Sequence, residues 1–210
     1  MTVERDGQLV IACRPEVPPE RLEKVIQDKR LWIYEKLLQK EALNPTPPVT
    51  KEFISGEGFY YLGRSYRLKL VHDTKQNQPL RFHQGCFLLQ ATAQADGREH
   101  FIYWYRTHLQ TQLEQMMPPL SRRVGAEPRS LQVRDLGYRW GSCGQKGDIS
   151  IHWRVAMLPK RMIEYVLVHE LVHLIEHQHS PEFWDRLERI LPDFDKRRSW
   201  LAEQGTCCSL

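Results

Sequence analysis

The longest hydrophobic pattern in this chain lies between Pro159 and about His177. Its apolar residues cover most of the surface of a helix and are Met162, Ile163, Val166, Leu167, Leu171, Val172, Leu174 and Ile175. A helix that is apolar nearly all round is usually buried. Pro159 suits its first turn, because the N–H that proline lacks has no helical partner there. The pattern therefore predicts a buried helix over this stretch.

Upstream of this helix, shorter patterns predict both strands and helices. The expected elements are a strand at Gln8–Cys13, a helix from Pro18 to about Lys40, hairpins at Phe59–Val71 and Leu80–Ala91, and a helix after Asp96 that Pro118 and Pro119 kink or end. The hairpins are expected to turn near Gly63 and at Gly85, because glycine adopts the backbone conformations that tight turns need.

Further patterns follow from about Arg129 to the end of the chain. They predict strands at Leu131–Arg134 and Asp148–Arg154 joined by Gly141–Gly144, then the buried helix, a helix at Pro181–Leu191 and a last short helix. We therefore predict an α+β chain. Residues 1–95 form a β-rich region with one helix, 96–205 form the core around the buried helix, and 206–210 form a tail.

The buried helix carries the sequence His169-Glu170-Leu171-Val172-His173. Residues four apart lie on one face of a helix, so two imidazoles with this spacing can chelate one metal ion. Glu170 projects about 100° away from them and can reach a water bound to that ion. Polar groups inside a buried helix cost a few kcal/mol each unless they are paired or ligated. The motif therefore indicates a metal site in which Glu170 serves the water.

A catalytic zinc needs a third protein ligand and one open position. His177 lies roughly 12 Å further along the helix axis than His169, so it cannot reach the same ion, and Glu176 fails for the same reason. Ser180-Pro181 resembles the start of a new helix, which places His179 in a turn that can fold back towards the metal. The zinc ligands that we assign are therefore His169, His173 and His179.

Two other interpretations of this motif stay open at this point. The histidines could be a coincidental pair packed in a core. Alternatively, the zinc could be structural, with Cys143 approaching in space, although structural sites are usually closed by four ligands and rich in cysteine. The helix has no cysteine near it in sequence.

Composition narrows the class of protein. The 210 residues are 41% hydrophobic and 27% charged, which is typical of a globular chain. No apolar run is long enough to span a membrane, and the first residues lack the blocks of a signal peptide. Five cysteines at irregular spacing do not make a disulfide framework, so we expect a reducing, cytoplasmic location.

The net charge of +4 is unevenly distributed. Between Ser121 and Arg161 there are nine Lys or Arg residues and three Asp or Glu residues. This segment is either a solvated face or a basic rim that attracts anionic substrates or nucleic acid.

Several segments together resemble the YgjP-like metallopeptidase domain family of predicted metal-dependent hydrolases. They are Arg139–Cys143, Ile149–Arg154, Ile163–Val166 running into the histidine motif, His179–Pro181 with Phe183-Trp184, Lys29–Ile33 and Tyr61–Tyr66. The resemblance covers about Gly7 to Glu203. Family members usually carry a further basic strand upstream of the point where this sequence begins.

This resemblance implies a zincin-like fold, in which a strand near the metal helix lines the substrate cleft. It also implies that His169, His173 and His179 bind zinc and that Glu170 is the general base. The sequence departs from the family where His152 replaces the common Asn, and near Gly137, where a basic residue is frequent. These departures concern substrate contacts and leave the ligand set intact.

Three functions follow as expectations. The first is a zinc metallopeptidase that binds a peptide or protein substrate by edge pairing with the strand at Asp148–Arg154. The second is a zinc-dependent nucleoside triphosphate pyrophosphatase, an activity that has been linked to the family. The third is a binding module without turnover, with nucleic acid as an improbable partner. Candidates for contacting the substrate or its oxyanion are His152, Arg154 and Tyr165.

Overall fold

The computed structural model describes residues 2–3, 9–11, 13, 17–30, 33, 50–72, 78–137, 139–205 and 210. By its internal contacts the chain divides into two compact units, Met1–Pro48 and Val49–Leu210. Residues 49–95 therefore lie in the same unit as the metal helix. A separate folding domain at 96–205 stays a prediction, and the tail at 206–209 lies outside the described residues.

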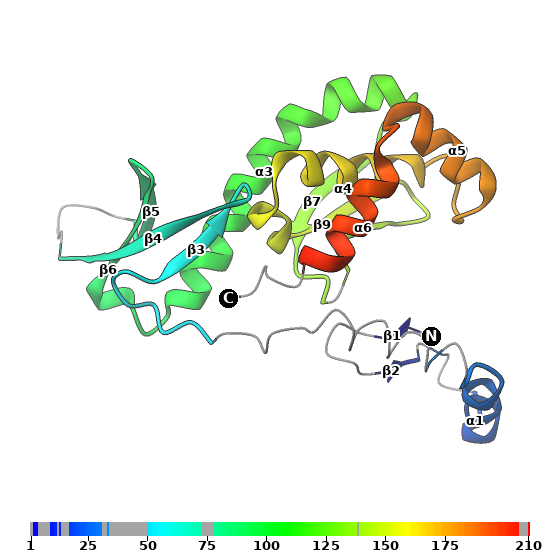
Figure 1. Cartoon of the computed structure of the whole chain (residues 1–210), viewed down its shortest axis with the longest axis horizontal. Coiled ribbons are helices and arrows are strands. Elements are labelled where there is room, and N and C mark those ends of the chain that lie inside the picture. The colour runs from blue at the N-terminus through cyan, green and yellow to red at the C-terminus, as the bar shows by residue number, and fades with distance from the viewer. Residues whose placement is uncertain are drawn as a thin grey trace. The chain divides into compact units, whose positions relative to one another are not determined.

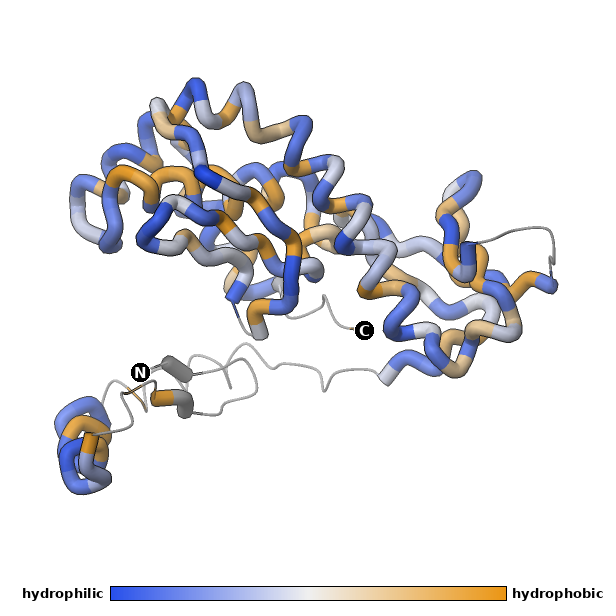
Figure 2. The backbone as a smooth tube through the Cα atoms, turned by 180° about the vertical axis from the view of Figure 1, so that it is seen from behind, coloured by the Kyte–Doolittle hydropathy of each residue, from blue (hydrophilic) through white to orange (hydrophobic). Residues whose placement is uncertain are grey.

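The first unit contains a short antiparallel strand pair and one helix. The strands are β1 (Thr2–Val3) and β2 (Leu9–Val10), and the helix is α1 (Pro19–Asp28). In Figure 2 the tube of α1 carries both hydrophobic and hydrophilic colours, as an amphipathic helix does. The extension of this helix that the sequence predicts, to about Lys40, lies mostly outside the described residues.

The second unit begins with a four-stranded sheet of order β3-β4-β6-β5. Its strands are β3 (Gly58–Tyr61), β4 (Arg64–Val71), β5 (Leu80–His83) and β6 (Cys86–Gln90). Both predicted hairpins are present, and they turn at Gly63 and Gly85, where φ is +81° and +76°. Because β4 and β6 pair in parallel, the two hairpins join into one sheet.

A long helix, α3 (Gly97–Val124), connects the two halves of this unit (Figure 1). It packs against β5, against the second sheet and against the metal helix. The prediction that Pro118 and Pro119 could end this helix is wrong, because α3 continues through both of them. Leu120 and Val124 beyond the prolines are buried, so packing holds this last turn in place despite the lost hydrogen bonds.

The second sheet has three strands in the order β7-β9-β8. They are β7 (Ser130–Arg134), β8 (Gly141–Cys143) and β9 (Asp148–His152). The segment predicted as a connection, 141–144, thus contains a strand of its own. The prediction that the strand at Asp148–Arg154 receives a peptide on its edge is wrong, because β9 is central, with β7 and β8 on its two sides.

The metal helix is α4 (Lys160–Val172), and it follows the 3₁₀ turn η2 (Trp153–Met157). Nine of its residues are buried, as the hydrophobic pattern predicts, and Figure 2 shows its tube mainly in the hydrophobic colour. The regular helix ends about five residues before the predicted His177. Two further helices, α5 (Pro181–Ile190) and α6 (Phe194–Gln204), pack against it. No described helix could cross a membrane, since none is both long and apolar enough.

The turn of the first hairpin anchors the start of the metal helix. The backbone N–H groups of Leu62 and Gly63 donate to the carbonyl oxygens of Ala156 and Met157, each at 2.9 Å. A Cβ atom at Gly63 would lie 2.7 Å from the ring of Pro159. The first sheet is therefore hydrogen-bonded to the 3₁₀ turn η2 just before α4 begins.

Candidate metal centre

Three histidines meet at the C-terminal end of α4. His169 and His173 lie one helical turn apart, and His179 comes from the turn between α4 and α5. One ring nitrogen from each lies within 4.8 Å of the others. The Nε2 atoms of His169 and His179 are 3.0 Å apart. This is close to the spacing of roughly 3.4 Å that tetrahedral ligation with bonds of about 2.1 Å requires.

The hydrogen bonds around the cluster explain how the chain turns back. The Nδ1–H of His173 donates to the carbonyl oxygen of Glu176 at 3.0 Å, which leaves Nε2 of His173 with its lone pair. Ser180 then caps α5 by accepting from the N–H of Phe183, as the sequence predicts. This turn brings His179 to the two helix histidines.

All three imidazoles are held in the neutral form that metal ligation requires. Burial, followed by the neighbouring histidines, lowers the pKa of His169 to about 3. Burial is also the first cause that lowers the pKa of His173 and of His179. Proton competition for the ligand nitrogens is therefore weak at neutral pH.

Aromatic rings from α5 surround the cluster. The ring of Phe183 is fully buried and lies 4.6–4.9 Å from all three imidazole centroids. The indole of Trp184 stacks on His179 at 5.4 Å with an interplanar angle of 19°. The Nδ1 of His169 is buried and has no hydrogen-bond partner in the part of the chain that the structure describes. Packing against Phe183 thus supports the ring orientation of His169.

Glu170 lies beside the cluster and faces the strand β8. The residue is 6% exposed, and burial raises the pKa of its carboxyl group to about 8, against a smaller opposing effect of Arg139. A Cβ atom built on Gly141 would come within 2.5–2.8 Å of three Glu170 side-chain atoms. The carboxyl group therefore rests directly against the backbone of this strand.

The neighbouring candidates stay outside the cluster. His177 is exposed, and its Nδ1 donates to the carbonyl oxygen of His173 at 3.0 Å. The carboxylate of Glu176 pairs with Arg186 at 3.6 Å. Cys143 lies on β8 near Glu170, and burial raises the pKa of its thiol, but it does not belong to the group of potential ligands.

The three predicted substrate contacts lie in different surroundings. His152 is 2% exposed, and its Nδ1 accepts from the N–H of Arg154 while its Nε2 lies 3.3 Å from Asp135. The guanidinium of Arg154 lies over the ring of Trp153. This geometry favours structural roles for His152 and Arg154, and substrate contact by either stays a prediction.

Tyr165 is the one predicted contact next to the histidines. It lies one turn before His169 on α4, with ring centroids 5.9 Å apart. Burial raises its pKa to about 12, so the phenol is neutral at physiological pH. Its contact with the substrate also stays a prediction.

Sequence reasoning did not assign a site role to Gly141, Phe183 or Trp184. All three stand in segments that carry the family resemblance, Arg139–Cys143 and Phe183-Trp184, and this was the available signal. Their positions around the cluster come from tertiary packing, which periodicity does not reveal.

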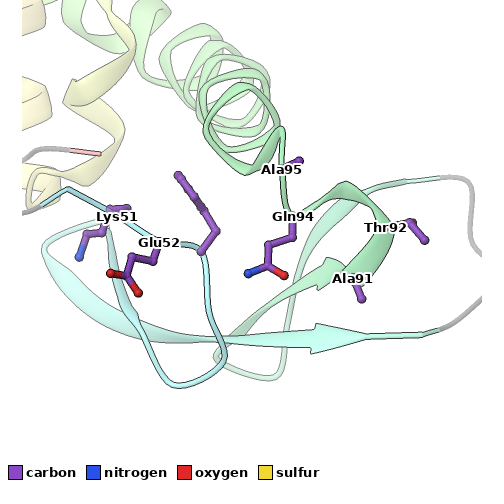
Figure 3. A pocket seen from close by; sticks show the side chains of 7 residues that line it. Lys51, Glu52, Ala91, Thr92, Gln94 and Ala95 are labelled. Carbon is purple, nitrogen blue, oxygen red and sulfur yellow. The ribbon is translucent and has the colours of Figure 1, made fainter.

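Two open grooves lie elsewhere in this unit. One, of about 590 Å³, lies between the segments Lys51–Phe53 and Ala91–Ala95, the second of which directly precedes α3 (Figure 3). The other, of about 600 Å³, runs over β7 and β9 and is lined by Arg129, Ser130, Gln132, Arg134, Asp148 and Ser150. Neither includes a histidine of the cluster.

The α+β fold and this cluster of histidines beside a buried glutamate define a candidate metal-dependent hydrolase. The family model "YgjP-like, metallopeptidase domain" matches residues 1–204. The chain therefore belongs to the YgjP-like metallopeptidase domain family and is, in general terms, a metal-dependent peptidase.

Among solved structures, the chain is similar to the metallopeptidase zymogen abylysin of Pyrococcus abyssi, with 21% identity and a TM-score of 0.40. That similarity covers 44% of this chain and 95% of the other. No curated protein matches the sequence significantly.

Proposed function

We propose that this protein is a zinc-dependent metallopeptidase in which His169, His173 and His179 bind the metal and Glu170 is the general base. The observation that carries the proposal is the meeting of three neutral imidazoles beside one buried carboxyl group. A set of three histidines leaves one coordination position open, as catalytic zinc sites do.

The residues present fit zinc well. Imidazole nitrogen is a preferred zinc ligand, and the hydrogen bond from His173 to Glu176 is the kind of contact that orients a ligating ring. When bound, zinc supplies Lewis acidity, which lowers the pKa of water and polarises a carbonyl group.

The chain's own part in the chemistry falls to Glu170. It takes the proton from the attacking water and passes it to the leaving amine. Burial raises its pKa towards the working pH, which makes the carboxylate a stronger base than a free glutamate. Glu170 directly follows the first metal histidine in the sequence, and its carboxyl group packs against the backbone of β8 at Gly141.

The substrate is proposed to pair with β8, which replaces β9 as the receiving edge. The N–H of His152 donates to Trp140 O, and the N–H of Gly144 donates to Asp148 O. In an antiparallel pair these bonded positions alternate, so Trp140, Ser142 and Gly144 bond to β9. The N–H and C=O groups of Gly141 and Cys143 then point to the open edge. An extended peptide can add there by main-chain hydrogen bonds.

The alternative substrate, a nucleoside triphosphate, needs free basic groups. Two arginines of the basic segment are already paired, Arg129 with Asp148 and Arg123 with Glu164. This favours a peptide or protein substrate. A module without turnover is disfavoured by family membership. The described cysteines Cys13, Cys86 and Cys143 are free thiols, and a cytoplasmic location stays a prediction.

The deciding experiment is a screen of the zinc-loaded protein against a broad peptide library and nucleoside triphosphates side by side. Glu170→Gln is the matched control in each assay, because it keeps the shape of the side chain and removes the base. We expect peptide cleavage that needs both zinc and Glu170. Salt-sensitive pyrophosphate release that depends on Glu170, with no peptide cleaved, would reverse the choice of substrate.

A further inference from the structure

Gly141, the first residue of β8, has no room for a side chain. A Cβ atom there would lie 2.5 Å from Oε1, 2.7 Å from Cγ and 2.8 Å from Cδ of Glu170. Non-bonded carbon atoms normally stay about 3.5–4.0 Å apart. Any side chain at this position would therefore displace the Glu170 carboxyl group by about 1 Å.

The backbone conformation does not explain this glycine. Gly141 is not among the glycines with positive φ, so an alanine could adopt the same backbone conformation. Gly144, three residues further on, also lacks a positive φ, and a Cβ atom there would meet its nearest neighbour at 3.5 Å, an ordinary contact. Neither glycine is required by a positive φ, and only at Gly141 would a Cβ atom clash, which makes the nearby Gly144 a matched control.

We propose that Gly141 is a positioning residue for Glu170: by lacking a side chain, it lets the carboxyl group lie against the edge strand beside the metal histidines. This inference rests on the proposed role of Glu170 as the general base. The helix α4 positions the Cα atom of Glu170, and the backbone at Gly141 leaves the space that the far end of its side chain occupies. The position of the base is thus set from two elements that are far apart in sequence.

The same residue has a second, separable role in the proposed substrate pairing. Gly141 offers its N–H and C=O groups to the substrate, whereas it serves Glu170 through the missing side chain. An alanine keeps both backbone groups and removes only the space. Gly141→Ala is therefore expected to lower kcat and to leave KM nearly unchanged. A purely structural disturbance of the strand would change both.

The first test uses thermal unfolding of the metal-free full-length protein, so it does not depend on activity. Gly141→Ala should lower Tm by roughly 2–10 °C, because inserted atoms in a packed site strain their surroundings. Glu170→Ala removes all three atoms that the new Cβ atom would meet. In that background the same Gly141→Ala change should alter Tm by about 1 °C or less, as should Gly144→Ala in the wild-type background. An equal loss of Tm in the wild-type and Glu170→Ala backgrounds would overturn the proposal.

The second test is kinetic and is made on zinc-loaded protein with measured metal content. A displacement of the base by about 1 Å can cost about 100-fold in rate, so kcat for Gly141→Ala should fall by that order. In the Glu170→Gln background Gly141→Ala should cause no further loss, because the group that it displaces no longer acts. Undiminished kcat in Gly141→Ala would refute a positioning role. If the wild type cleaves no peptide, the proposed function fails, while the Tm comparison still decides whether Gly141 seats Glu170.

Discussion

The two halves of the larger unit use aromatic residues for different purposes. Under the sheet β3–β6, rings pack on other rings: Phe59 stacks on Phe101 at 4.1 Å, and Phe87 lies 5.0 Å from both Phe101 and Trp104. Around α4, the rings of Phe183 and Trp184 pack on imidazoles instead. The first arrangement stabilises a core, and the second orients groups that can bind a metal.

The buried polar groups follow the same division. Among the described residues, the buried polar or charged residues are Ser121 near the end of α3, Ser150 and His152 on β9, and Glu170 on α4, and none lies in the sheet β3–β6. Burying such groups costs free energy unless they are paired or ligated. The half with the sheet β3–β6 is therefore held by apolar packing, while the half around α4 also buries polar groups that need a partner or a ligand.

The largest effect is expected from removing the base. Glu170→Gln should lower kcat by about 10²–10⁴-fold, the usual contribution of a general base, without loss of zinc or of the fold. Metal content should stay near that of the wild type, since the side chain is off the ligand face. Loss of zinc from this variant would make Glu170 a ligand and contradict the assignment.

Two buried phenylalanines, Phe87 on β6 and Phe183 on α5, give the sharpest comparison of the two halves. Phe87→Ala and Phe183→Ala should each cost about 3–5 kcal/mol of stability, because both rings are fully buried. Only Phe183→Ala should also weaken zinc binding, because Phe183 packs on all three imidazoles. Competition with a chromophoric chelator measures this at a temperature where both variants are folded. Equal zinc affinities for the two variants would show that Phe183 is ordinary core.

In metal-free protein, the free energy of unfolding should fall on the acid side because of His169 and on the alkaline side because of Glu170. The pKa of His169 is lowered from 6.5 to about 3, so the unfolded state binds more protons in that range and stability falls as pH drops below about 6.5. The pKa of Glu170 is raised from 4.5 to about 8, so the folded state binds more protons between these values. Stability therefore falls as pH rises from 4.5 through 8.

Variants at the two positions separate these effects. Glu170→Gln should remove the loss on the alkaline side, a gain of roughly 2–4 kcal/mol near pH 8.5 relative to wild type at the same pH, with little change below pH 4.5. Phe87→Ala should lower stability about equally at both pH values, because it removes no titrating group. Denaturant unfolding at several pH values measures both. The same alkaline slope in Glu170→Gln as in wild type would contradict the raised pKa.

Sequence reasoning reached the parts of the fold that local patterns determine. The hairpins were predictable, because Gly63 and Gly85 mark turns between alternating strands, and α4 was predictable from its apolar surface. The strand β8 was not, because Gly-Ser-Cys has little strand preference of its own and becomes a strand only by pairing with β9. That omission also led to the wrong receiving edge. The helix α3 continues beyond its prolines because Leu120 is buried there, and this burial is likewise a tertiary effect.

The candidate site likewise has a part that local sequence patterns predict and a part that they do not. Helical spacing brings His169 and His173 together, and the N-cap at Ser180 indicates the turn that returns His179. The contact of Glu170 with Gly141 depends on how β8 packs against α4, and the periodicity of hydrophobic residues does not encode that contact. The resemblance pointed to the segment around Gly141 without giving its physical reason.

The smallest effect is expected at Trp184, which stacks on His179 and lies tilted, 6.3 Å away, beside the ring of His169. Its indole stacks on His179 and continues to Phe194, 5.7 Å away at 20°. Because His179 comes from an exposed turn, this stack restricts its ring more than the backbone does. Trp184→Ala should weaken zinc binding by about 10-fold, at the low end for groups that orient ligands, whereas Trp184→Phe should recover most of it by keeping a stacking ring. Cobalt substitution gives a second measurement, since the absorption spectrum of bound cobalt reports ligand geometry. An unchanged affinity and spectrum in Trp184→Ala would mean that the turn alone positions His179. The stack of Trp184 on His179 would then contribute only to packing, as the rings under the sheet β3–β6 do.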